Sequence, residues 1–137
     1  MNEPASTPAS TQTIDLERVI CRLIDLERHG AHGFTIGEGD FPLRGFVVRV
    51  GNDVRGYVNR CPHAGHPLDL LPQRFLTADG ALILCSSHGA LFEKTTGQCV
   101  AGPCVGRSLV PVPVEVRRGC VLLADEADIN ALAAQRA

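Results

Sequence analysis

Two short pairs of cysteine and histidine are the residues of this chain best suited to chemistry. Cys61 and His63 fall within the stretch CPHAGH, and Cys85 and His88 fall within CSSHG. Each pair offers one thiolate sulfur and one imidazole nitrogen, which are the ligand types that bind zinc and iron–sulfur centres. The sequence therefore predicts a metal centre that is held by two loops.

The order of the ligands favours one kind of centre. Structural zinc sites usually contain a C-x-x-C pair or an H-x3–5-H pair, whereas here cysteine and histidine alternate. A [2Fe–2S] cluster with two thiolates on one iron and two imidazoles on the other suits this alternation, because each loop then supplies one ligand to each iron. Two other interpretations stay open at this point. One is a structural zinc site, and the other is a set of core and surface residues that bind no metal.

The two motifs together resemble the cluster-binding loops of the Rieske iron–sulfur proteins. GPCVG at residues 102–106 resembles the proline-containing third loop that covers the cluster in that family, and the similarity extends over about residues 19–123. The resemblance implies one [2Fe–2S] cluster per chain, with Cys61 and Cys85 on the buried iron and His63 and His88 on the outer iron. The spacer at residues 64–84 is longer than in small bacterial ferredoxins of this family.

The resemblance also implies an all-β fold. We expect a Rieske-type antiparallel β-sandwich or barrel as a base, with an inserted cluster-binding subdomain at about residues 59–105. The domain should span residues 14–124, after a disordered tail at residues 1–13 that is rich in Pro, Ser and Thr. The C-terminal tail at residues 125–137 is predicted to form a short helix capped by Asp125.

Short β-rich runs and turn residues predict the individual strands. Gly51 to Asp53 should be the turn of a hairpin between strands at residues 44–50 and 54–59. Pro111 and Pro113 cannot donate to a ladder, so residues 109–116 should form an edge or partly irregular strand. The other strands are expected at residues 19–24, 34–36, 81–84, 91–93, 98–100 and 120–123.

Composition excludes several classes of protein. The 137 residues suit one domain, and the net charge of −2 gives no support for nucleic-acid binding. No apolar run approaches the roughly 20 residues that span a bilayer. The N-terminal stretch MNEPASTPASTQT resembles neither a secretory signal nor a twin-arginine signal. We therefore expect a cytoplasmic protein, without a membrane or nucleic-acid partner, and a monomer.

The remaining cysteines have less specific roles. Cys21 and Cys120 lie in apolar runs and should be small core residues. Cys99 and Cys104 flank the sequence VAGP near the third loop, where they either fill space beside the cluster or pair with each other. His29 and His32 are more typical of solvated loop residues than of metal ligands.

Two departures from the family pattern bear on the reduction potential. Respiratory and photosynthetic members carry a disulfide between the two loops, but the matching positions here are His66 and Ser87. Those members also place a serine and a tyrosine that donate to the cluster sulfurs, where this chain has Ala90 and Phe92. Fewer donors stabilise the added electron less, so the sequence resembles the low-potential ferredoxins of the family.

The resemblance implies a one-electron carrier that works between a reductase and a terminal oxygenase or other redox enzyme, and that is not an enzyme itself. One alternative is the small iron–sulfur subunit of a larger reductase, similar to that of nitrite reductase. A second alternative is a metal-stabilised binding module without a redox role. Leu68, Leu91 and Pro103 are candidates for an apolar rim where a redox partner docks, although Leu91 could equally be a core residue.

Overall fold

The computed structural model describes residues 16–62, 65–69, 71 and 73–134. The predicted tail at residues 1–13 and the predicted ligand His63 lie outside this part of the chain. The strands are β1 (Val19–Arg22), β2 (Ala31–Ile36), β3 (Leu43–Val50), β4 (Asp53–Val58), β5 (Leu82–Leu84), β6 (Leu91–Glu93), β7 (Cys99–Ala101), β8 (Pro111–Val112), β9 (Val114–Arg117) and β10 (Cys120–Leu123). The helices are η1 (Leu16–Arg18), α2 (Leu23–His29) and α3 (Ile129–Ala133).

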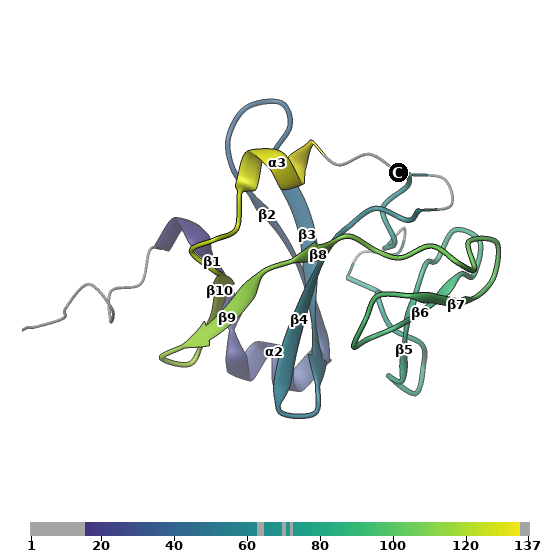
Figure 1. The fold of residues 1–137 in the computed structure, drawn as a ribbon. Helices are drawn as coiled ribbons and strands as arrows, with labels where there is room; N and C mark the ends of the chain where they lie inside the picture. Colours follow the sequence, from purple (N-terminus) through teal and green to yellow (C-terminus); the bar gives the residue numbers. More distant parts are fainter. Residues whose placement is uncertain (1–15, 63–64, 70, 72, 135–137) are drawn as a thin grey trace, which may run out of the picture.

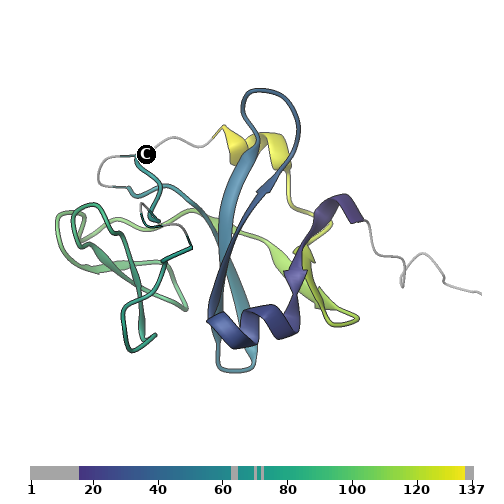
Figure 2. The ribbon, with the colours of Figure 1, turned by 180° about the vertical axis from the view of Figure 1, so that it is seen from behind.

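The strands form three antiparallel sheets, which confirms the expected all-β fold. One sheet has the order β1-β10-β9, a second has the order β2-β3-β4-β8, and a small third sheet has the order β5-β6-β7. The first two sheets make up a base, and β5, β6 and β7 form a separate lobe beside it (Figure 1). The view from behind shows the same division (Figure 2). Within the described residues the base is an open sandwich and not a closed barrel.

The second sheet separates two hydrophobic cores. Val47 of β3 packs into the core of the base, whereas its neighbours Phe46 and Val48 pack into the core of the lobe. Successive side chains of a strand point to opposite faces, so this run of apolar residues is explained by burial on both sides. The second sheet, which lies between the two cores, is therefore the element that positions the lobe.

The hairpin of β3 and β4 delivers the chain to the first predicted loop. Val50 pairs with Asp53 across a two-residue turn in which Gly51 has φ 61°. A glycine with positive φ at the first central position suits the twist of a hairpin. The strands at both ends of the second predicted loop are also confirmed, since Leu84 of β5 pairs with Leu91 of β6.

Two strand predictions are wrong in part. The strand expected at residues 19–24 ends at Arg22, and the chain continues as α2, which the sequence interpretation missed. Gly30, with φ 79°, ends α2 by donating its N–H to the Leu26 carbonyl at 2.7 Å, and Leu26 is fully buried. The strand expected at residues 34–36 is the end of the longer β2.

The run at residues 109–116 is not one strand. β8 pairs with the edge of the second sheet through Val112 and Gly56, whereas β9 pairs with β10 of the first sheet. The chain crosses between the sheets at Pro113, whose carbonyl accepts from the Ala124 N–H at 3.0 Å.

The C-terminal helix α3 is present, but its cap is not the expected residue. Asp128 accepts a hydrogen bond from the Ala131 N–H at 3.1 Å, so Asp128 rather than Asp125 caps α3. No helix of the described chain is both long and apolar enough to cross a membrane.

Candidate metal centre

The first loop follows β4 and turns back sharply on itself. The Cys61 N–H donates to the His66 carbonyl at 2.8 Å, and the Gly65 N–H donates to the Cys61 carbonyl at 2.8 Å. Gly65 has φ 75°, a conformation that side chains disfavour. The Arg60 guanidinium also donates to the Gly65 carbonyl at 3.1 Å. These bonds fix the backbone at Cys61 and Gly65, on either side of the residues that the structure does not describe.

The second loop, between β5 and β6, is closed in the same way. The Cys85 N–H donates to the Ala90 carbonyl at 2.9 Å, and the Gly89 N–H donates to the Cys85 carbonyl at 2.9 Å. Gly89 has the same φ of 75° as the glycine of the first loop. Each cysteine therefore starts a turn that a glycine four residues later closes, which the two motifs alone do not reveal.

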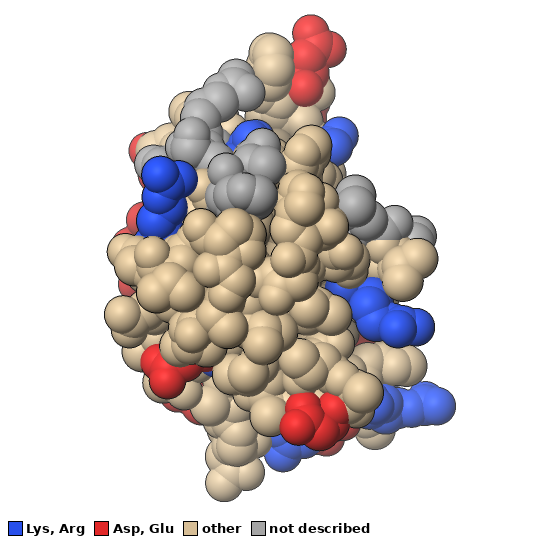
Figure 3. Space-filling view, turned by 90° about the vertical axis from the view of Figure 1, so that its right-hand side faces the viewer, with Lys and Arg blue, Asp and Glu red and all other residues tan. Residues whose placement is uncertain are grey.

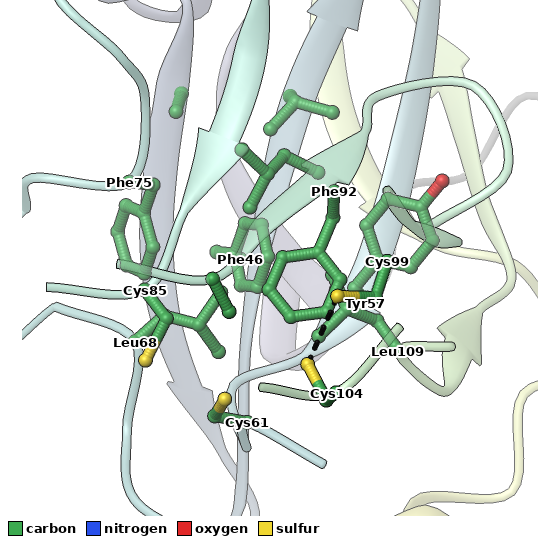
Figure 4. Packing of buried hydrophobic residues seen from close by; sticks show 14 residues of the cluster. Phe46, Tyr57, Cys61, Leu68, Phe75, Cys85, Phe92, Cys99, Cys104 and Leu109 are labelled. Carbon is green, nitrogen blue, oxygen red and sulfur yellow. Dashed lines mark hydrogen bonds between the residues drawn. The ribbon is translucent and has the colours of Figure 1, made fainter. Parts of the chain in front are cut away.

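The fold brings the two cysteines into one buried cluster. Cys61 is 2% exposed and Cys85 is 1% exposed, and both belong to the core of the lobe (Figure 4). The Ser86 N–H donates to the Leu68 carbonyl at 2.9 Å, which ties the second loop to the segment that follows the first. Leu68 is fully buried, so the prediction that it lies on an exposed rim is wrong. Leu91 is half-buried, and Pro103 is exposed.

The described histidine of the site lies at the surface. His88 is exposed, and its Nδ1 is 3.2 Å from the Ser87 hydroxyl. The second loop thus places its sulfur in the interior and its imidazole in solvent. His63 lies outside the described residues, so its position stays a prediction.

The third loop contacts both of the others. Its Gly102 packs so closely on the second loop that an added Cβ would lie 2.8 Å from the Ala90 Cα. Arg107, just after the loop, donates to the Pro62 carbonyl of the first loop at 2.8 Å. No motif marked Arg107 in the sequence, because its partner lies 45 positions away.

Cys99 and Cys104 bring two more sulfurs to the same region. All six cysteines belong to the described part of the chain, and none of them is in a disulfide. Cys99 and Cys104 are nonetheless in contact, with 3.1 Å between their Sγ atoms. Cys21 is buried as predicted, whereas Cys120 is only partly buried.

The donor set fits a cluster with mixed ligands. Two buried sulfurs on equivalently closed loops, with an imidazole toward solvent, provide the soft and borderline ligands that such a cluster needs. The Ser86 hydroxyl is buried beside Cys85 and lacks a partner among the described residues, so it is free to donate to a bound group. Within the described chain, no three His, Cys, Asp or Glu side chains form a group that could hold a metal ion, and this applies to His29 and His32 as well.

Comparisons with known proteins agree with this geometry. The family model described as Rieske [2Fe–2S] domain matches residues 17–118. A comparison with curated proteins finds no match.

Solved structures with this fold include several ferredoxins. The ferredoxin of carbazole 1,9a-dioxygenase from Nocardioides aromaticivorans IC177 is 29% identical, with a TM-score of 0.61 over 78% of this chain and 94% of that chain. A structure of reduced oxygenase in complex with oxidized ferredoxin of carbazole 1,9a-dioxygenase is 28% identical, with a TM-score of 0.61 over 81% of this chain and 94% of that chain. A ferredoxin of Sphingomonas yanoikuyae B1, at 23% identity and a TM-score of 0.58 over 79% of this chain and 96% of that chain, shares the fold. Because the family model spans most of the residues, this chain belongs to the Rieske [2Fe–2S] domain family.

Proposed function

We propose that this chain is a one-electron carrier between a reductase and a terminal oxygenase or other redox enzyme. Its single [2Fe–2S] cluster is held by Cys61, His63, Cys85 and His88. When bound, such a cluster takes up and releases one electron. The chain itself transforms no substrate in this proposal and acts as one component of an oxidoreductase system.

The observation that carries the proposal is the matched closure of the two loops. Cys61 and Cys85 each begin a turn with the same two backbone hydrogen bonds, and both sulfurs are buried. The cysteines therefore anchor the site in the core, whereas the exposed His88 marks the side that a partner protein can approach. A buried metal centre with an accessible histidine side suits transfer to a docked partner.

The surface of the lobe supports docking. The face on the lobe side of the molecule is mostly uncharged, with Lys, Arg, Asp and Glu mainly around its margin (Figure 3). Val105 of the third loop is 64% exposed, and Val100 of β7 is 45% exposed. Exposed apolar residues on a weakly charged face are typical of interaction sites. The solved complex of an oxygenase with a related ferredoxin supports the same kind of partner.

The proposal includes the bounds and the location of the domain. We place the domain at residues 14–124 and its cluster-binding part at about residues 59–105. We place the protein in the cytoplasm, because none of its six cysteines is in a disulfide, which suits a reducing compartment.

Metal analysis and site variants test the proposal. Purified protein should contain about two irons and two labile sulfides per chain. Cys61→Ser and Cys85→Ser should each abolish the visible absorbance, whereas the matched control Cys120→Ser should retain it. One zinc per chain without sulfide would contradict the assignment. Elution with a large partner, instead of as a free carrier, would contradict the proposed role while leaving the cluster intact.

A further inference from the structure

The sulfur atoms of Cys99 and Cys104 are in direct contact inside the lobe. Cys104 Sγ lies 3.1 Å from Cys99 Sγ and donates to it, and the dashed line in Figure 4 marks this contact. Cys99 in turn donates to the Ala101 carbonyl at 3.2 Å, so both residues are thiols in this structure. Because a disulfide bond is about 2.05 Å long, an approach of about 1 Å would join the two sulfurs.

The backbone holds the two cysteines face to face. The Cys99 N–H donates to the Arg107 carbonyl at 2.9 Å, and the Arg107 N–H donates to the Cys104 carbonyl at 3.0 Å. Both cysteines are therefore bound to the same residue. Cys99 also pairs with Phe92 in the sheet of the lobe, whereas Cys104 lies within the third loop. A bond between the sulfurs would thus connect this loop covalently to the sheet.

The third loop is the segment that such a bond would restrain. Gly102 and Gly106 stand at its two ends with φ values of 96° and 97°, and glycine is less restricted in conformation than any other residue. The loop contacts the second loop through Gly102 and lies just before Arg107, which binds the first loop at Pro62. A ring closed between residues 99 and 104 would remove part of the freedom of the loop that contacts both others.

The two sulfurs are buried under a short, exposed segment. Cys99 is 2% exposed and Cys104 is 3% exposed, but Val100 beside the first is 45% exposed and Val105 beside the second is 64% exposed. A local opening of residues 100–105 is therefore enough to uncover the sulfurs, and such openings occur without global unfolding. A small oxidant such as a peroxide suits this access better than a second protein does.

We propose that Cys99 and Cys104 are an oxidation site, where hydrogen peroxide converts the two thiols into a disulfide that locks the third loop. One cysteine sulfur attacks a peroxide oxygen, the O–O bond breaks, and a sulfenic acid and one water are formed. The other sulfur then attacks the sulfenic sulfur, the S–O bond breaks, and the S–S bond forms as a second water leaves. The thiols lose two electrons and two protons, and the peroxide is reduced to two waters. A dithiol reductant reverses the change.

The lock should slow the loss of the metal centre, a consequence that rests on the proposed function. The third loop contacts both loops that carry the predicted ligands, so iron can leave more readily when this loop is open. A disulfide removes open conformations of the chain that it closes into a ring. We expect the rate at which a chelator takes iron from the protein to fall roughly tenfold in the oxidised form.

The bond can be detected in the wild-type protein, without any variant. Trypsin cleaves after Lys94 and Arg107, and the peptide 95–107 contains Cys99 and Cys104 and no other cysteine. The iron-loaded protein is treated with hydrogen peroxide, the excess is removed with catalase, and remaining thiols are alkylated in denaturant. Mass spectrometry should find this peptide without alkyl groups and lighter than its dithiol form by two hydrogens. Dithiothreitol before alkylation should restore the doubly alkylated peptide.

Iron release is then compared between the oxidised protein and the same sample after dithiothreitol. Cys99→Ser and Cys104→Ser should each show no slowing after peroxide, because neither can form the bond. Cys120→Ser is the matched control, and it should form the bond and show the full slowing.

Three results would overturn the inference. One is a peptide 95–107 that stays doubly alkylated under conditions that fully oxidise free cysteine in a parallel sample. Another is a disulfide that joins Cys99 or Cys104 to a different cysteine of the chain. The third is an equal rate of iron release before and after the bond forms, which would refute the lock. A protein that forms the bond but contains no iron and sulfide would refute the proposed function alone, so the two failures are distinguishable.

Discussion

Replacing Gly102 by alanine tests how tightly the third loop packs on the second. Gly102 has φ 96°, and its added Cβ would lie 2.8 Å from the Ala90 Cα and 3.3 Å from the Ala90 nitrogen. Both are backbone atoms, which cannot rotate away. Positive φ costs about 1–2 kcal/mol for a residue with a Cβ. The forced contact adds about 1–3 kcal/mol. We therefore expect Gly102→Ala to lose roughly 2–4 kcal/mol of stability, after a small gain from the less flexible unfolded chain.

Gly106→Ala is the matched control within the same loop. Gly106 has almost the same φ, 97°, but an added Cβ there meets nothing within 4 Å. It should cost about 1 kcal/mol, which is the strain alone. The assay is anaerobic urea unfolding of the iron-loaded proteins, followed by visible absorbance and far-UV circular dichroism. Equal losses in the two variants would show that the close approach of Gly102 to Ala90 gives way at no cost, and would refute the reasoning.

Three further predictions concern the linking segment, the base and the lobe. Asn59 donates to the Asp69 carboxylate at 2.9 Å, so Asn59→Asp should place two carboxylates together and lose about 1–3 kcal/mol in urea unfolding. Adding Asp69→Asn should restore part of the loss, and no restoration would exclude this pairing. Burial raises the pKa of Cys21 from 9.0 to about 11. About 1–3 kcal/mol of folding stability is therefore present below pH 9 and should be lost between pH 9 and 11. Cys21→Ala should flatten that part of the plot of stability against pH. Phe92→Tyr should raise the reduction potential in voltammetry if its hydroxyl reaches the cluster, and an unchanged potential with intact visible absorbance would show that it does not.

Local signals in the sequence predicted much of the lobe. The turn at Gly51 and the boundaries of β5 and β6 follow from period-2 runs between turn residues. The two loop motifs placed Cys61 and Cys85 together because ligand spacing is itself a local signal. These features depend on residues close in sequence, which is why a single chain reveals them.

The features that the sequence did not predict depend on tertiary packing. α2 is short, and its start has no side-chain cap, so only Gly30 after the run marked its end. The crossing at Pro113 depends on which sheet each half of the segment meets, and the burial of Leu68 depends on packing in the core of the lobe.

The position of β3 and β4 between the two hydrophobic cores has a consequence for the cooperativity of unfolding. Phe46 and Val47 are adjacent in the chain, but they belong to different cores, and both are fully buried. An opening of the lobe that exposes Phe46 therefore removes support from the strand that also backs the base. We expect the amide protons of β3 to exchange with solvent only in the global unfolding reaction, and not in a separate opening of the lobe. Iron loading should accordingly slow amide-proton exchange in the base as well as at the metal centre, because a bound centre stabilises the whole domain against unfolding.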